Sequence, residues 1–116
     1  MSDSQDDVFR AMFFEEAREL LAHLHSGLSS LAQASGDRTV LERTYRDAHS
    51  LKGAAAMVGY PTIADAARKL EQALLQARTG KAPMTTELAR ALAIDRDHLA
   101  HLIESEERQL RGRLQS

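Results

Sequence analysis

Apolar residues recur at helical spacing in four stretches of this chain, and three short breaks rich in Gly, Pro, Ser and Thr separate them. The breaks fall at residues 35–37, 59–61 and 79–83. No stretch alternates apolar and polar residues as a half-buried strand does. The pattern predicts helices at about 6–33, 38–58, 61–79 and 85–110. The first carries the longest apolar series: Phe9, Met12, Phe13, Ala17, Leu20, Leu21, Leu24, Leu28 and Leu31.

Four amphipathic helices joined by short connections predict an all-α fold, an antiparallel up-down-up-down four-helix bundle. One such bundle accounts for residues 1–116, so we expect a single domain. Residues 104–116 are highly charged, with Leu110 and Leu114 as their large apolar residues. We expect this segment to form a charged, solvated C-terminal helical extension.

The helix ends carry recognisable capping residues. Gly36 is expected to cap the C-terminus of the first helix. The second helix has two candidate N-caps, Asp37 and Thr39, of which Thr39 begins a capping-box pattern. Thr85 and Thr86 are the corresponding alternatives for the fourth helix.

Two residues fit the helical patterns poorly. Phe14 lies roughly 120° around the helix from Leu20, so it is either at the edge of the core or an exposed apolar contact for a partner. Asp95 falls on the apolar stripe of the fourth helix by phase, and the pattern gives no account of it.

Composition excludes several classes of protein. The chain has no cysteine and a net charge of −2, which argues against a disulfide scaffold and against a nucleic-acid partner. No apolar run approaches the roughly 20 residues of a membrane span, and the acidic residues 1–7 do not resemble a signal peptide. We therefore expect a cytoplasmic location, with no nucleic acid and no membrane among its partners.

The chain lacks the common catalytic motifs. It contains no phosphate-binding glycine loop, no H-E-x-x-H and no G-x-S-x-G. His98 and His101 have a spacing that would suit a metal, but no third ligand is evident, so no metal site is expected. These absences favour a carrier or substrate over a self-sufficient enzyme.

His49 is the residue on which a reactive site can be built. Helical phase puts it roughly 160° from the apolar stripe of its helix, among Glu42, Tyr45, Arg46, Lys52, Gly53 and Ala56. A neutral imidazole nitrogen is a good nucleophile. The ordinary pKa of histidine is about 6.5, so much of the imidazole is neutral near pH 7. The competing interpretation is an ordinary solvated histidine on a helix surface.

A phosphoryl acceptor would need three kinds of help, and the sequence offers a candidate for each. Glu71, on the next helix, is a candidate acceptor for the second ring nitrogen. Lys52, one turn after His49, is a candidate cation for phosphoryl oxygens. Gly53 leaves the surface beside the ring bare, at a cost to the helix of roughly 0.8–1 kcal/mol relative to Ala.

The segment A-H-S-L-K-G-A-A-A-M-V-G-Y at residues 48–60 resembles the H-x-[LI]-K-G-x-x-x-x-x-G-[FY] signature of histidine-containing phosphotransfer (HPt) domains. Residues 13–21, 45–49 and 70–80 are similar to the corresponding helices of the phosphotransfer domain of CheA-type chemotaxis kinases. The resemblance covers roughly residues 8–103. It implies that His49 is the phosphorylated histidine and that Glu71 hydrogen-bonds it.

The resemblance also implies roles for nearby residues. Lys52 matches the lysine near the phosphoryl group, and Gly53 matches the small residue that lets a receiver domain dock. Arg68 stands where CheA-type domains often carry a second histidine, a departure that leaves its contact with a phosphoryl oxygen open. Tyr45, Ala56 and Phe14 are further candidate contacts for the receiver.

The implied function is that of a phosphocarrier in two-component signalling. The ATP-binding domain of a histidine kinase, or a receiver aspartate, loads His49, and a CheY-like receiver domain takes the phosphoryl group onto its own Asp. Mg²⁺ and ATP are supplied by these partner domains, and this domain binds no cofactor itself. Only 13 residues follow Ile103, so the fifth helix of many CheA-type domains is not expected. A free-standing protein, a domain of a hybrid kinase and a fragment of a longer kinase all remain open.

Two other functions compete. One is a non-phosphorylated helical adaptor, against which the intact set of His49, Lys52, Gly53 and Glu71 argues. The other is the dimerisation region of a sensor kinase, in which an acidic residue follows the histidine. Ser50 follows it here, and four helices are expected in one chain, so we expect a monomer.

Overall fold

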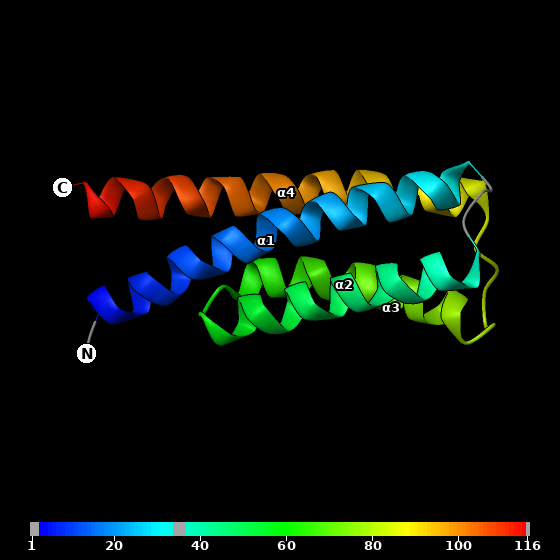
Figure 1. The fold of residues 1–116 in the computed structure, drawn as a ribbon, viewed down its shortest axis with the longest axis horizontal. Helices are drawn as coiled ribbons and strands as arrows, with labels where there is room; N and C mark the ends of the chain where they lie inside the picture. The colour runs from blue at the N-terminus through cyan, green and yellow to red at the C-terminus, as the bar shows by residue number, and fades with distance from the viewer. Residues whose placement is uncertain (1–2, 34–36, 116) are drawn as a thin grey trace.

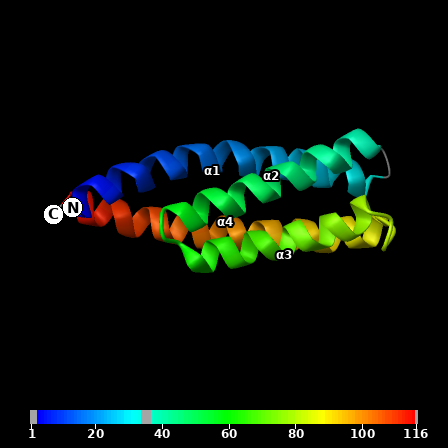
Figure 2. The same cartoon turned by 90° about the horizontal axis from the view of Figure 1, so that it is seen from below.

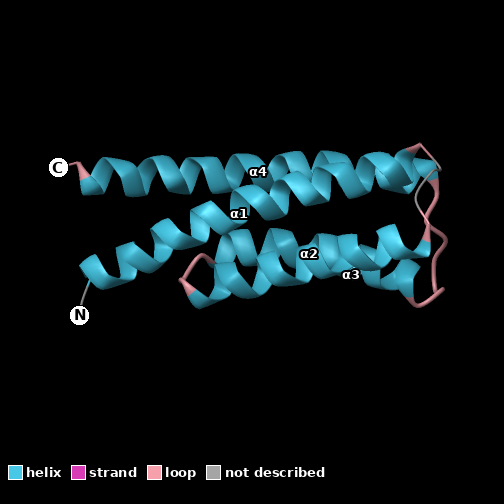
Figure 3. Ribbon diagram, viewed as in Figure 1, coloured by secondary structure: helices cyan, strands magenta, loops and turns pink. Residues whose placement is uncertain are grey.

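The computed structural model describes residues 3–33 and 37–115. They form four helices: α1 (Asp3–Ala32), α2 (Arg38–Met57), α3 (Pro61–Arg78) and α4 (Thr86–Leu114) (Figure 1). The described residues that follow or precede the helices form turns and short loops (Figure 3). The predicted all-α antiparallel bundle is confirmed, and each helix end lies within a few residues of its predicted position.

The four helices make an elongated bundle measuring 47 × 20 × 19 Å. α1 runs beside α4, and the shorter α2 and α3 form a hairpin packed against them (Figures 1 and 2). The N-terminal end of α1 and the C-terminal end of α4 lie at the same end of the molecule. Both reach beyond the turn that joins α2 to α3 (Figure 1). At that end α1 therefore extends past α2 and α3, and its neighbour there is α4.

Buried residues on α1 follow a spacing of three and four: Phe14, Ala17, Leu21, Leu24, Leu28 and Leu31. Such a 3.5-residue repeat drifts by about 20° per seven residues against a straight helix of 3.6 residues per turn. The drift brings Phe14 into the core, where it is 2% exposed, and leaves Phe9 and Met12 exposed. The prediction of Phe14 as an exposed partner contact is therefore wrong, and its ring packs on Tyr60 instead.

Leu88 and Leu102 of the predicted stripe on α4 are only partly buried, so the buried seam is rotated by part of one residue step from that stripe. It consists of Ala89, Leu92, Leu99, Ile103 and Leu110. Arg96 continues the seam, with its side chain 19% exposed and its Nε donating to the carbonyl of Leu21. Asp95, beside it, is exposed. The sequence pattern placed Asp95 on the apolar stripe because it did not distinguish between two neighbouring faces of the helix.

Side chains and glycines define the helix ends. Asp37, not Thr39, caps α2 by accepting from the Val40 amide, and Thr85, not Thr86, caps α4. The ends of α2 and α3 are closed by Gly59 and Gly80, whose φ angles are +83° and +80°. The predicted cap Gly36 lies outside the described residues.

The C-terminal extension is helical, as predicted, but it is not simply solvated. Leu110 is 3% exposed in the core. Arg113 pairs with Asp7 at 3.2 Å, and Glu107 pairs with Arg18, both across to α1. The two long helices are therefore joined along their free ends by apolar packing and ion pairs.

Candidate functional site

His49 lies in the middle of α2, on the face that points away from the core. Its side chain is 58% exposed. The opposite face of the helix carries the buried residues Thr44, Ala48, Leu51 and Ala55. The exposure that helical phase predicted for His49 is confirmed, and it follows from one face of α2 packing into the bundle.

A buried carboxylate on α3 holds the imidazole. Glu71 is 3% exposed, and its Oε2 is hydrogen-bonded to Nδ1 of His49. Lys52 Nζ donates to both carboxylate oxygens, at 2.9 and 3.1 Å. The α2–α3 hairpin thus brings together three residues that the sequence placed on two different helices.

Burial by itself would raise the pKa of Glu71. The hydrogen bonds from His49 and Lys52, together with the ammonium charge, outweigh burial and lower the pKa below its ordinary value. Glu71 is therefore ionised at neutral pH. A buried carboxylate is tolerated here because it is paired and hydrogen-bonded on both oxygens.

The ionised carboxylate selects the tautomer of the ring. A carboxylate only accepts hydrogen bonds, so Nδ1 of His49 must carry the proton that is shared with Glu71. In a neutral imidazole the other nitrogen, Nε2, then keeps its lone pair. The site accordingly presents one nucleophilic nitrogen on an exposed face of the helix.

Lys52 was expected to stand ready for phosphoryl oxygens. In the structure its ammonium instead binds Glu71, while its side chain remains 30% exposed. It lies one turn from His49, so the two share the same carboxylate. In this structure Lys52 therefore helps to keep Glu71 ionised and in position.

The surface beside His49 is bare on one side. No atom lies within 4 Å of where a Cβ on Gly53 would be, so packing within the chain does not require glycine there. Ala56, one turn further, is also exposed. Arg68 pairs with Asp65 at 2.7 Å, and its described hydrogen bond does not lead to His49.

Tyr45 packs beside the imidazole, and residues that the sequence did not single out support it. The Tyr45 and His49 rings are nearly parallel, with centroids 6.1 Å apart. Arg78 of α3 lies over the Tyr45 ring and donates to Glu42. The sequence did contain a signal for Arg78. It lies two helical turns after Glu71, so both side chains are on the same face of α3.

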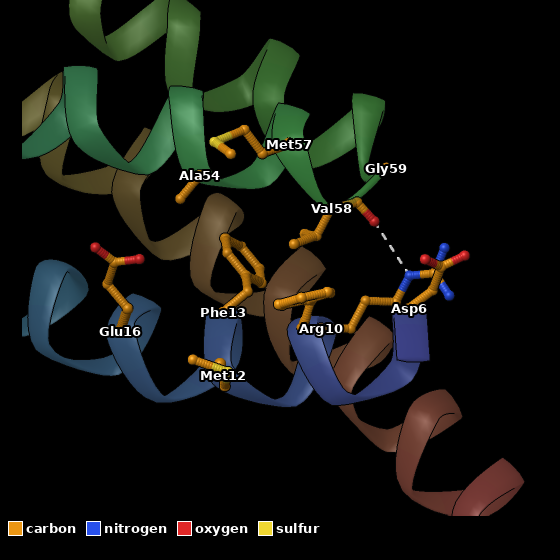
Figure 4. A pocket seen from close by; sticks show the side chains of 10 residues that line it. Asp6, Arg10, Met12, Phe13, Glu16, Ala54, Met57, Val58 and Gly59 are labelled. Atoms are coloured by element: carbon orange, nitrogen blue, oxygen red, sulfur yellow. Dashed lines mark hydrogen bonds between the residues drawn. The ribbon is translucent and has the colours of Figure 1, made fainter. Parts of the chain in front are cut away.

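An apolar groove opens next to this surface, between α1 and the C-terminal end of α2. It encloses about 760 Å³. Met57 and Ala54 of α2 lie across from Met12 and Phe13 of α1 (Figure 4). Met57 is 89% exposed and Met12 is 60% exposed. Relative to His49, Ala54 lies about 140° and Met57 about 80° around the helix, so the groove flanks the histidine face near the C-terminal end of α2.

The structure also bears on metal sites and on membrane-spanning helices. Within residues 3–33 and 37–115, no three side chains of His, Asp or Glu converge as metal ligands would. Among the helices described above, none combines the length and the apolar character that crossing a membrane requires.

Known proteins resemble the chain over most of its length. The Hpt domain family matches residues 8–109, so the chain belongs to the Hpt domain family. The resemblance read from the histidine segment is thereby confirmed.

Among characterised relatives, the chain is similar to the chemotaxis protein CheA of several bacteria. It is 35% identical to CheA of Salmonella typhimurium over 80 residues, which is 69% of this chain and 12% of that protein. The identity is 36% over 81 residues for CheA of Klebsiella aerogenes, again 12% of the relative, and 30% over 94 residues for that of Bacillus subtilis, 14% of the relative. The chain thus spans about one eighth of the length of these relatives. No solved structure matches it.

Proposed function

We propose that this domain carries a phosphoryl group on His49 in a two-component signalling system. Membership of the Hpt family and similarity to CheA support histidine phosphotransfer as the class of activity. The observation that carries the assignment to one atom is the hydrogen bond between Nδ1 of His49 and buried Glu71, which leaves Nε2 as the nucleophile.

The transfer can be written with its charges balanced. The Nε2 lone pair attacks the γ-phosphorus of ATP held by a histidine kinase domain, and the bond to the leaving oxygen breaks with its electron pair remaining on ADP. The proton stays on Nδ1, and the ring becomes positively charged. Glu71 stabilises that charge because its carboxylate accepts the Nδ1–H hydrogen bond.

The second transfer returns the site to its starting state. A carboxylate oxygen of a receiver aspartate attacks phosphorus, and the N–P bond breaks with its electron pair returning to Nε2. The imidazole is then neutral, with Nδ1 still protonated toward Glu71. In this proposal Lys52, which is bonded to Glu71 one turn from His49, shares its ammonium with the phosphoryl oxygens during these steps. ATP and Mg²⁺ belong to the partner domains.

The receiver docks, in this proposal, over the part of α1 and α2 around His49. Gly53 and Ala56 are exposed there, and the groove beside them offers apolar contact through Met12 and Met57. Exposed apolar surface next to a reactive group is typical of a site for a transient protein partner. A CheY-like receiver domain is the partner that we propose.

The decisive experiment is phosphorylation by a histidine kinase core with radiolabelled ATP. Label on the wild-type chain should be acid-labile, alkali-stable and absent from His49→Gln, and addition of a receiver domain should remove it. Equal labelling of His49→Gln would overturn the assignment of His49. A wild-type chain that binds a signalling partner but takes no label would point instead to the adaptor function.

A further inference from the structure

The hydrogen bond to Glu71 fixes one edge of the imidazole but not its plane. His49 is more than half exposed, and a single bond at Nδ1 allows the ring to tilt about that bond. The ring of Tyr45, one turn earlier on α2, lies 6.1 Å away between centroids and is inclined by 22°. Tyr45 is therefore an offset, nearly parallel neighbour of the imidazole.

Tyr45 is itself held from the other helix of the hairpin. The guanidinium carbon of Arg78 lies 4.8 Å from the centroid of the tyrosine ring. Arg78 Nε donates to Glu42 at 2.7 Å, which fixes the guanidinium over the ring. Tyr45 is partly buried and packs against the core cluster. Contacts with Arg78 and with the core cluster thus limit where the Tyr45 ring can be.

We propose that Tyr45 and Arg78 are positioning residues that hold the plane of the His49 imidazole, so that Nε2 stays aimed at an incoming phosphoryl group. This inference rests on the proposed function, since it concerns the reactivity of the same nitrogen. It replaces the expectation that Tyr45 is a contact for the receiver. Arg78 acts through Tyr45, and Glu42 acts through Arg78.

The chain supplies a matched control for charge. Arg46 also donates to Glu42, at 3.2 Å, and its side chain is 74% exposed. Arg46→Gln and Arg78→Gln each remove one cation from the same carboxylate. Of these two arginines, Arg78 is the one whose guanidinium lies over the Tyr45 ring.

The test uses phosphoramidate, a small donor that needs no docking surface. Nε2 bonds to phosphorus while the P–N bond of the donor breaks and ammonia leaves with the electron pair. We expect Tyr45→Leu and Arg78→Gln to react about two- to tenfold more slowly than wild type, the range that a lost aromatic contact implies. Tyr45→Phe keeps the ring and should stay within about twofold of wild type, as should Arg46→Gln.

A second readout follows the ring itself. In nuclear magnetic resonance spectra, the carbon-bound protons of His49 should lose the ring-current shift from Tyr45 in Tyr45→Leu and change it in Arg78→Gln. The same protons should be little affected in Arg46→Gln. Cooperative thermal unfolding of each variant checks that the bundle is intact.

Two outcomes would overturn the inference. If Tyr45→Leu reacts with phosphoramidate at the wild-type rate but is slow only with a receiver, Tyr45 is a partner contact. If Arg46→Gln and Arg78→Gln slow the reaction equally, charge and not the stacked ring is responsible. Failure of the proposed function gives a different result, because label would then persist in His49→Gln while the ring-current shifts still report the stack.

Discussion

The buried carboxylate of Glu71 binds two partners, the imidazole of His49 and the ammonium of Lys52. It binds the imidazole through one oxygen and the ammonium through both. Because it is buried, its field acts through little water and orients both partners strongly. At the scale of single residues, the tautomer of His49 is therefore set by a residue on another helix.

Removing Glu71 should slow phosphorylation without unfolding the chain. We expect Glu71→Ala to reduce the single-turnover rate with a kinase core by about 10- to 100-fold, the effect typical of losing a hydrogen-bond partner behind a reactive histidine. The reason is that Nδ1 loses the acceptor that fixes the tautomer. Asp65→Ala, which removes an exposed carboxylate from the same helix, is the control. A Glu71→Ala rate equal to that of Asp65→Ala would remove Glu71 from the mechanism.

Glu71 should also make stability depend on pH. Its pKa is lowered in the folded protein, so the unfolded chain binds a proton there more readily than the folded one. The stabilisation is fully present above the ordinary value of 4.5 and is lost as pH falls through the lower folded value. Urea unfolding should show that the advantage of wild type over Glu71→Gln shrinks as pH falls below 4.5. A constant difference would contradict the lowered pKa.

Gly53 separates stability from function. A methyl group there would meet no atom within 4 Å, and Ala is favoured over Gly inside a helix. Gly53→Ala should therefore raise the free energy of unfolding by about 0.5–1 kcal/mol. The same methyl group would stand on the surface beside His49 and should slow transfer to a receiver.

The control for Gly53 is Gly112→Ala, which adds a methyl group to an open position on α4. It should leave transfer unchanged, and phosphoramidate labelling should be unchanged in both variants because that donor is small. Receiver transfer at the wild-type rate in Gly53→Ala would show that the bare surface has no role in docking.

At the scale of elements, α2 owes its position to a close approach by α1. A Cβ on Gly27 of α1 would lie 2.1 Å from Oγ1 of Thr44, which is 1% exposed and donates to the carbonyl of Val40. The absent side chain of Gly27 lets the two helices meet there. This contact lies on the buried face of the helix that carries His49 on its other face.

Gly27→Ala should destabilise the bundle by about 1–3 kcal/mol, because a methyl group would overpack a buried threonine. Adding Thr44→Ala should relieve part of that loss, so the double variant should be more stable than the sum of the single effects predicts. Urea unfolding of the four proteins measures the coupling. Additive effects would show that the helices can separate without penalty.

At the scale of the whole molecule, one chain closes its own core. The four helices bury a continuous apolar cluster within the chain. The long helices α1 and α4 are joined at their ends through Asp7 and Arg113, and Arg10 of α1 donates to the carbonyl of Val58 at the end of α2. The pKa of Asp7 is lowered: burial opposes the shift, and the hydrogen bonds from Arg113 and Arg10 outweigh it.

We therefore expect a monomer in solution. Sedimentation equilibrium at micromolar concentration should give a mass near 12.8 kDa. The groove of α1 and α2 leaves Met12 and Met57 exposed, and it is the surface on which a second copy would pack if the expectation failed. A dimer that Met57→Glu dissociates would contradict the monomer and place self-association at that groove.

The sequence alone determined the number of helices and the exposure of His49. The helical spacing of leucines and alanines predicted four helices, and the same periodicity put His49 on the exposed face of α2, because a helix that packs on one side exposes the other. The sequence indicated Glu71 as a candidate acceptor for His49. It could not show that the carboxylate would be buried, or that Lys52 would bind the same carboxylate.

The tertiary structure decided what depends on contacts between helices. Phe14 is buried and Asp95 is exposed, and only the packing between helices resolved both positions. The stack of Arg78, Tyr45 and His49 joins two helices across the hairpin, so neither helix alone implies it. Sequence spacing places Tyr45 beside His49 on one helix, whereas Arg78 reaches the pair from α3 only when the chain folds.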